Sequence, residues 1–234
     1  MSTGKTVAIV QSNYIPWKGY FDLINMVDEF ILFDDVQYTR RDWRNRNRIK
    51  TAHGITWLTI PVEVTGKYTQ KIKDTRIADP AWAENHWKTI RLAYARAACF
   101  NDFEERLRSL YLSEQPAYLS EVNQRFLKAI CDMLGITTAI RTSMEYSIHD
   151  VEKNERLIAL CLQAGASRYI SGPAARNYLD EGLFCEQGIT VSWMDYSGYP
   201  EYPQVHPLFE HSVSIIDLIL NTGKNARSYM KSFT

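Results

Sequence analysis

The chain has 234 residues, of which 45% are hydrophobic and 23% charged, a composition that excludes an intrinsically disordered protein. Its 27 Lys and Arg residues balance 27 Asp and Glu residues, so the overall charge is not that of a dedicated nucleic-acid-binding protein. No apolar run approaches the roughly 20 residues that a membrane-spanning helix needs, and we expect no membrane insertion. The length favours one domain over residues 1–234.

The four cysteines, Cys99, Cys131, Cys161 and Cys185, lie far apart and form no Cys-x-x-Cys pair. Neither a zinc site nor a redox pair is therefore supported. Cys131 and Cys161 fall within apolar helical patterns, which predicts buried free thiols. Free thiols and the absence of a signal-peptide pattern together predict a cytoplasmic protein.

The first part of the chain predicts a strand–helix–strand unit. Residues 7–10 and 29–33 are short apolar runs typical of buried strands, and residues 20–27 have helical spacing. Because the three elements lie within about 30 residues, the two strands should be parallel neighbours. A further strand is predicted at residues 57–62, where Pro61 favours a sheet edge or a strand end.

The rest of the chain alternates between helical and strand patterns. Helices are predicted at residues 80–100, 103–111, 118–134, 154–164 and 212–220, and short strands at residues 138–140, 169–170 and 189–193. This alternation predicts an α/β fold with a parallel-centred sheet flanked by helices.

The loop between the first strand and the first helix is a candidate binding loop. Gly19 at the helix start would let the backbone approach a ligand, and a helix N-terminus favours an anion. The layout resembles the HIGH loop of nucleotidyltransferases and pantothenate synthetase, where two histidines steady the phosphates of ATP. Trp17 and Tyr20 hold those places here and carry no positive charge, so ordinary adenylation is not expected. A turn packed by these two rings is the alternative.

Two carboxylates follow the second strand, where ligands of open α/β sheets collect. Asp34 and Asp35 there could hold Mg²⁺, orient a hydroxyl or amine, or take a proton, and Gln37 would contact the same ligand. A solvated turn cap is the alternative. Among the scattered histidines, His206 is the best general-base candidate by elimination. No cluster with metal-ligand spacing is present, so no metal site is predicted.

A dense basic run follows and comprises Arg40, Arg41, Arg44, Arg46, Arg48 and Lys50. If residues 44–50 are extended, their four basic side chains share one face. Arg44, Arg46 and Arg48 would then clamp a phosphate or carboxylate. A salt-bridge network with the two aspartates is the alternative. RNA binding would need aromatic residues alternating with the charges, and only Tyr38 and Trp43 are near in sequence.

A later loop offers further candidates for ligand binding. Ser171 and Gly172 follow the strand at residues 169–170 and could offer hydroxyl and backbone N–H donors to an anion. Tyr178 would add to the same site, although an ordinary turn is the alternative. We expect Ser171 or Tyr178 to line one cleft together with Gln11, Tyr14, Asp34, Asp35, Arg44 and Arg46.

Three segments together resemble the WbqC-like protein family. They are QSNYIPWKGYF at residues 11–21, FDDVQY with WRNRNRI at residues 33–38 and 43–49, and YISG, YL and YPQ…SIIDL at residues 169–172, 178–179 and 202–218. The sequence departs from the family pattern at Ser12 and Asn13, where Pro followed by an aromatic residue or Asn is expected.

The resemblance implies a bacterial setting and a role in O-antigen, lipopolysaccharide or other surface-polysaccharide biosynthesis. It implies a transferase that forms an amide by acyl or aminoacyl transfer onto a nucleotide-linked amino sugar. Arg44, Arg46 and Arg48 would hold the diphosphate, and Asp35 or His206 would deprotonate the amine. Coenzyme A, an aminoacyl-tRNA and an adenylate stay open as donors, and nucleic acid is expected only as that tRNA. The alternative is a non-catalytic protein that binds a sugar nucleotide or a partner enzyme.

Overall fold

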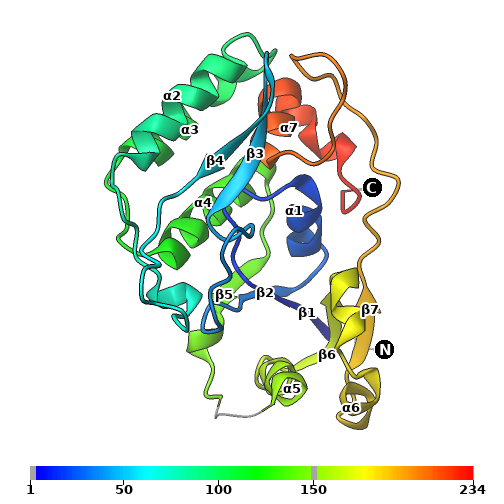
Figure 1. The fold of residues 1–234 in the computed structure, drawn as a ribbon. Coiled ribbons are helices and arrows are strands. Elements are labelled where there is room, and N and C mark those ends of the chain that lie inside the picture. Colours follow the sequence, from blue (N-terminus) through cyan, green and yellow to red (C-terminus); the bar gives the residue numbers. More distant parts are fainter. Residues whose placement is uncertain (1–3, 149–151, 234) are drawn as a thin grey trace.

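The computed structural model describes residues 4–148 and 152–233 and is built around a five-stranded parallel sheet (Figure 1). Its strands lie in the order β5-β2-β1-β6-β7. They are β1 (Lys5–Val10), β2 (Glu29–Leu32), β5 (Ala139–Thr142), β6 (Ala166–Ser171) and β7 (Thr190–Trp193). The predicted α/β fold with a parallel-centred sheet is confirmed.

The predicted strand–helix–strand unit is confirmed as β1, α1 (Lys18–Asn25) and β2. β1 and β2 pair in parallel, from Val7 opposite Glu29 to Val10 opposite Leu32. Such a unit occurs throughout doubly wound folds, so the likeness to a HIGH-type nucleotidyltransferase unit stays a prediction.

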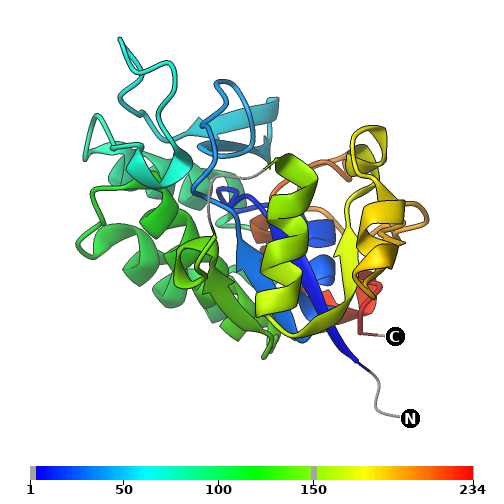
Figure 2. The same cartoon turned by 90° about the horizontal axis from the view of Figure 1, so that it is seen from below.

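Helices cover both faces of the sheet because side chains alternate along its strands. Ala8 packs in the larger core with α1, α4 (Leu119–Leu134) and α7 (Ile215–Thr222), whereas Val7 and Ile9 pack with α5 (Lys153–Gln163). Seen from below, α5 lies across the sheet (Figure 2). The remaining helices are α2 (Trp82–Tyr94), α3 (Phe100–Leu112) and the six-residue α6 (Glu181–Glu186), which had not been predicted.

Among the described residues, four short 3₁₀ segments complete the helices, at Ile72–Asp74, Ser143–Glu145, Pro173–Asn177 and Gly223–Tyr229. Within residues 4–148 and 152–233, no helix is long and apolar enough to cross a membrane. All four cysteines are free, and Cys131 and Cys161 are buried as predicted.

The basic run forms an antiparallel hairpin outside the main sheet. β3 (Arg46–Thr51) pairs with β4 (Gly54–Thr59), and Arg48 lies opposite Trp57. The strand predicted at residues 57–62 therefore begins and ends three residues earlier. Its chain turns away before Pro61, which has no N–H to donate to a ladder.

A long segment without helix or strand joins β7 to α7. We call residues 194–214 the C-terminal strap, drawn in orange along one side of Figure 1. Lys18 Nζ donates to the carbonyl of Pro200 at 3.0 Å, and the Tyr199 hydroxyl donates to Asp22 at 2.6 Å. These bonds fasten the strap to α1. Burial lowers the pKa of Lys18 to about 8.

Candidate functional site

The order of the strands predicts where a ligand would bind. From β1 the chain passes to β2 on one side, whereas β6 lies on the other side of β1. Ligands of open α/β sheets bind at such a switch point, beyond the carboxyl ends of the strands. The loop that follows β1 therefore borders the expected site.

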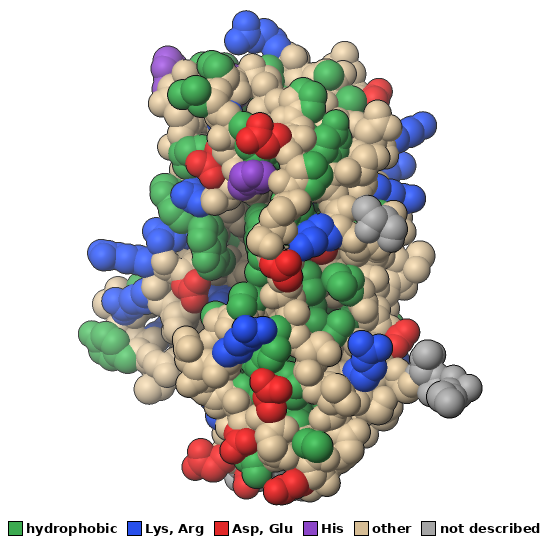
Figure 3. Space-filling model, turned by 90° about the vertical axis from the view of Figure 1, so that its right-hand side faces the viewer, with side chains coloured by type: hydrophobic (Ala, Val, Ile, Leu, Met, Phe, Trp, Pro, Cys, Tyr) green, Lys and Arg blue, Asp and Glu red, His purple; other side chains and the backbone are tan. Residues whose placement is uncertain are grey.

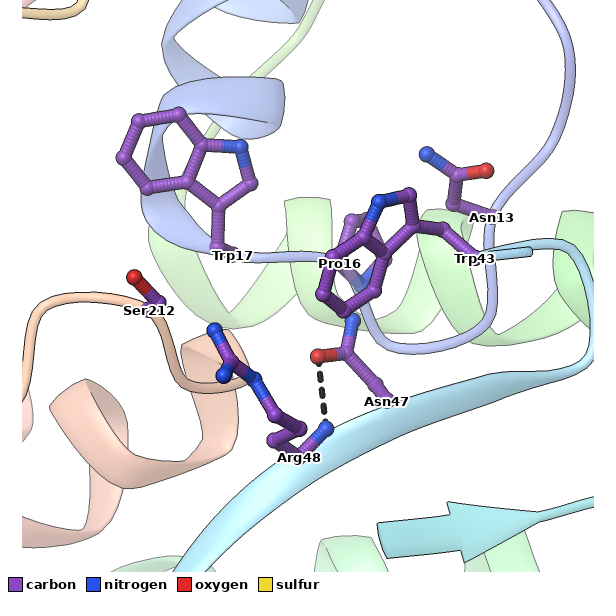
Figure 4. A pocket seen from close by; sticks show the side chains of 7 residues that line it. All are labelled: Asn13, Pro16, Trp17, Trp43, Asn47, Arg48 and Ser212. Carbon is purple, nitrogen blue, oxygen red and sulfur yellow. Dashed lines mark hydrogen bonds between the residues drawn. The ribbon is translucent and has the colours of Figure 1, made fainter. Parts of the chain in front are cut away.

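A cavity of about 250 Å³ lies against this loop (Figure 4). It is lined by Asn13, Pro16, Trp17, Trp43, Asn47, Arg48 and Ser212. Three regions that are distant in sequence therefore meet here: the loop after β1, the basic run and the C-terminal strap. We call it the tryptophan cavity.

The tryptophan cavity combines two aromatic walls with one cation. Trp17 and Trp43 lie on opposite sides, and the side chain of Arg48 extends from β3 toward the space between them (Figure 4). The Arg48 guanidinium carbon lies 5.6 Å from the ring centre of Trp43. Within the described part of the chain, no residue accepts a hydrogen bond from the Arg48 side chain, whose Nε is buried. The cavity is thus suited to a ligand with a flat apolar surface and an anionic group.

The loop that forms one wall of the cavity is strained. Ile15 is fully buried and has a φ of 37°, a backbone conformation that β-branched residues rarely adopt. Asn47 Nδ2 donates to the carbonyls of Tyr14 and Ile15 at 3.1 and 3.0 Å. The Ile215 N–H also donates to the Pro16 carbonyl at 2.9 Å. Such strain costs about 1–3 kcal/mol and persists where surrounding contacts hold it, often at a binding site.

Arg44 holds the same loop from the opposite side. Its Nη1 donates to the carbonyls of Gln11 and Ser12 at 3.3 and 3.5 Å and to the side-chain oxygen of Asn13. The Arg44 side chain is only 11% exposed. Arg44 therefore positions the loop, and Gln11 takes part through its backbone carbonyl.

Trp17 explains the glycine at the start of α1. Its ring packs edge-on against Tyr196 and Tyr199, with ring centres 5.2 and 5.5 Å apart. A Cβ atom at Gly19 would lie 2.4 Å from the Trp17 ring, so no side chain fits there. Tyr20 points the other way and donates to the Gln11 carbonyl at 3.0 Å, and burial raises its pKa. Gly19 and Tyr20 thus serve the packing of the turn, which was the alternative to ligand binding. Trp17 packs in the same turn and also lines the cavity.

The two carboxylates after β2 have different partners. Asp34 is fully buried and accepts from the Ser12 N–H at 2.8 Å and from the Ser120 hydroxyl of α4. Burial raises its pKa, although those donors and Arg44 oppose the shift. Asp35 is half-buried and pairs with Arg156 of α5 and with the Ser143 hydroxyl. Neither carboxylate lines the tryptophan cavity.

Tyr14 lies in the core and not at a cleft. Its hydroxyl contacts His86 Nδ1 at 2.9 Å and the Tyr111 hydroxyl at 2.8 Å, and burial raises its pKa. His86 Nε2 is 3.2 Å from the Thr59 carbonyl, which requires the proton on Nε2. With Nδ1 unprotonated, as the lowered pKa of His86 favours at neutral pH, the ring accepts from the Tyr14 hydroxyl, and His86 joins α2 to β4.

This buried histidine predicts acid sensitivity. Burial lowers the pKa of His86 to about 4, against 6.5 for a free histidine. Below pH 6.5 the His86 side chain is protonated in the unfolded chain, whereas in the folded protein it becomes protonated only near pH 4. The free energy of unfolding should therefore fall by about 3 kcal/mol between pH 7 and pH 4 through this group alone. Urea unfolding of wild type and His86→Gln at both pH values checks this, because the variant should lose less stability. Equal losses would contradict it.

The remaining predicted site residues are spread over other parts of the structure. Arg46 stacks on Trp57, and Gln37 donates to the Tyr68 carbonyl at 2.8 Å. His206 Nε2 contacts the Ala93 carbonyl at 2.9 Å, away from the tryptophan cavity.

Of the predicted residues around the end of β6, Gly172 lies nearest to the tryptophan cavity, through its neighbour Tyr196. Ser171 is buried and accepts a bond from the Tyr169 hydroxyl at 3.2 Å. Gly172 lies next to Tyr196, where a Cβ atom would be 3.8 Å from the hydroxyl oxygen, and Tyr196 packs on Trp17. Tyr178 instead stacks with Lys153 of α5, and burial raises its pKa.

Several residues of the site were not found from the sequence. Asn13, Asn47 and Ser212 line the cavity, and Trp57 stacks on the basic run. The alternation along residues 44–50 does place Asn47 on the face opposite the arginines. A side-chain amide on that inner face is the sequence feature that indicates a residue holding the loop after β1, as Asn47 does through the Tyr14 and Ile15 carbonyls. No group of three or more His, Cys, Asp and Glu side chains that could hold a metal is found within residues 4–148 and 152–233.

Comparisons with known proteins agree with the resemblance read from the three segments. The model of the WbqC-like protein family matches residues 11–229. A Mycobacterium tuberculosis (strain ATCC 25618 / H37Rv) protein, "Uncharacterized protein Rv1507c", is 52% identical over 227 residues, which cover 97% of this chain and 98% of that protein. No solved structure matches the chain.

Proposed function

Because the chain belongs to the WbqC-like protein family, we propose that it binds a nucleotide-linked sugar in the tryptophan cavity. The observation that carries this proposal is the Arg48 guanidinium, which lies between two indole walls without a hydrogen-bond acceptor among the described residues. A diphosphate supplies the oxygens that a guanidinium binds in pairs. The base or the sugar supplies a flat surface for Trp17 or Trp43, and Asn13 and Ser212 can bond to hydroxyl groups.

The proposed setting is the cytoplasmic part of bacterial surface-polysaccharide biosynthesis, as the family resemblance implies. The second candidate function is acyl or aminoacyl transfer onto an amino sugar in that pathway. The position of Asp35 just beyond the carboxyl end of β2 favours it, although this carboxylate is 16% exposed and is paired with Arg156. Neither Asp35 nor His206 lines the cavity, however, so ligand binding is better supported than catalysis.

Thermal unfolding with a panel of UDP-, GDP- and dTDP-linked sugars tests the binding proposal. A ligand at 100 times its dissociation constant stabilises the folded state by about 2.7 kcal/mol. For a chain of this size the Tm should rise by several degrees, at about 2–4 °C per kcal/mol. Arg48→Ala should remove most of that rise, because truncating one partner of a desolvated charge pair costs about 2–5 kcal/mol of binding.

The ligand-free protein provides the control. Arg48→Ala should lower its Tm only slightly, since the Arg48 side chain donates no hydrogen bond within residues 4–148 and 152–233 and loses only its contacts with the rings of Trp43 and Trp57. Arg46→Ala removes the same charge from the same strand but lies outside the cavity lining, so it should keep the ligand-induced rise. Clear destabilisation of ligand-free Arg48→Ala, together with no rise for any sugar nucleotide, would mean that Arg48 is part of the scaffold.

A further inference from the structure

The basic residues of this neutral chain are concentrated in one region. Residues 37–76 contain ten Lys and Arg residues against three Asp and Glu residues, a net charge of +7. Since the whole chain is balanced at 27 of each, the remainder carries −7. We call residues 37–76 the basic lobe; it consists of the β3–β4 hairpin and the loops on both sides of it.

Figure 3 shows Lys and Arg side chains projecting from the left border of the molecule, next to a hollow beside hydrophobic side chains, and others at the top and at the upper right border. Asp and Glu side chains gather at the lower end of the same view. Because the net charge of +7 is concentrated in the basic lobe, an anionic polymer would be drawn to that lobe.

Aromatic rings alternate with these charges on the hairpin. The guanidinium of Arg46 lies 4.2 Å from the Trp57 ring centre, and that of Arg48 lies 5.6 Å from the rings of both Trp43 and Trp57. The two indole rings are 5.5 Å apart with an angle of 32° between their planes. They are 40% and 42% exposed, which is a large fraction for tryptophan.

A second aromatic–arginine pair extends this pattern over the lobe. The Arg40 guanidinium lies 5.5 Å from the ring of Tyr68, which is 74% exposed. The Nε atoms of Arg46 and Arg48 are also without hydrogen-bond partners among the residues described. Aromatic rings therefore do alternate with the arginines, although few aromatic residues are near them in sequence. The ring of Trp57 comes from the neighbouring strand, because Arg48 pairs with Trp57 in the hairpin.

We propose that the outer face of the basic lobe, formed by Arg46, Arg48 and Trp57 of the hairpin and by Trp43 just before it, binds single-stranded nucleic acid. Exposed indoles offer stacking surfaces to unpaired bases, and the arginines bind the phosphates between them. A duplex keeps its bases stacked on one another and would use only the charges. The proposal goes beyond sugar-nucleotide binding and does not require it.

Fluorescence anisotropy with labelled 12-nucleotide oligo(U) and oligo(dT) tests the proposal on the full chain. Both single strands should bind, whereas a duplex of the same length should bind more weakly. Trp57→Ala should weaken single-strand binding by about 5- to 150-fold, the range expected when one stacked base is lost. Trp57→Phe keeps a stacking ring and should restore part of the affinity. The RNA and DNA arms show whether the ribose hydroxyl contributes.

Charge and stacking are separated by the salt dependence. Arg46→Ala should make the plot of log K against log salt concentration shallower by about 0.7, the contribution of one neutralised phosphate in a single strand. Arg176→Ala is the matched control, because its guanidinium lies 5.2 Å from the Trp193 ring, outside the basic lobe, and it should change neither affinity nor slope.

Three results would overturn the proposal. The first is equal affinity for the duplex and the single strand. The second is complete competition by inorganic polyphosphate at the same charge concentration, together with unchanged binding by Trp57→Ala. The third is a folded Trp57→Phe variant, verified by its Tm, that binds no better than Trp57→Ala. The face shares Trp43 and Arg48 with the tryptophan cavity, whereas Trp17 lines only the cavity. Trp17→Ala therefore separates the two proposals, since it should affect a sugar nucleotide and not the oligonucleotides.

Discussion

Replacement of Asp217 by alanine is expected to lower the free energy of unfolding by about 4 kcal/mol, because it leaves two buried hydroxyl donors, those of Tyr94 and Tyr202, without their acceptor, whereas Gln204 keeps its bond to the Glu210 carbonyl. The carboxylate is fully buried and accepts from the Tyr94 and Tyr202 hydroxyls at 2.7 and 2.8 Å and from Gln204 Nε2 at 2.9 Å. Burial raises the pKa of Asp217, and the three donors oppose that shift. Each orphaned donor costs about 1–3 kcal/mol.

The reason for so large an effect is that Asp217 connects three parts of the fold. Tyr94 belongs to α2 and also accepts from the backbone N–H of Lys50 in β3 at 3.1 Å. Tyr202 and Gln204 belong to the C-terminal strap, which supplies Ser212 to the tryptophan cavity. Loss of the carboxylate should therefore loosen the strap and weaken ligand binding as well.

Urea unfolding at neutral pH measures the first effect. Asp217→Asn retains one acceptor oxygen and should lose less stability than Asp217→Ala. Asp132→Ala is a suitable control, because Asp132 is an exposed aspartate on α4 and such surface changes usually stay within about 0.5 kcal/mol. A loss of under about 1 kcal/mol for Asp217→Ala would mean that solvent reaches the Tyr94 and Tyr202 hydroxyls.

Replacement of Arg44 by alanine is expected to cost about 3–4 kcal/mol of stability and to abolish binding in the tryptophan cavity. Arg44 donates to the carbonyls of Gln11 and Ser12 and to the Asn13 side chain, and hydrogen bonds from charged groups contribute about 1.5–3 kcal/mol each. Without them the strained backbone at Ile15 can relax, and Asn13 and Trp17 would leave the positions that define the cavity.

Comparison with Arg48→Ala makes this prediction specific. Arg44→Ala should lower both the Tm and the ligand affinity, whereas Arg48→Ala should lower mainly the affinity. Arg44→Lys keeps the positive charge but lacks the planar guanidinium with its several N–H donors. It should therefore recover only a small part of the Tm and of the ligand affinity. If Arg44→Ala kept the wild-type Tm and lost only ligand binding, Arg44 would contact the ligand directly instead of positioning the loop.

The sequence by itself determined the sheet and most of the helices. Strand–helix–strand spacing at residues 7–33 predicted parallel neighbours, and β1 and β2 pair in that way. The alternation along residues 44–50 predicted one face for the arginines, and Arg46 and Arg48 share a face on β3. Arg44 does not join them, because it lies in the turn before β3 and donates to the loop after β1. These features depend on local periodicity, which fixes the side of an element that each side chain occupies. The six residues of α6 were too few to show such a period.

Only the tertiary structure decided which of the polar residues share a site. Asp34 and Asp35 are adjacent in sequence, yet one meets α4 and the other α5 because successive side chains point to opposite sides of an extended chain. Ser212 reaches the cavity because the strap folds back over α1, and Trp57 joins the arginines through the register of the hairpin. Contacts between residues so far apart depend on packing and register, which no local pattern records.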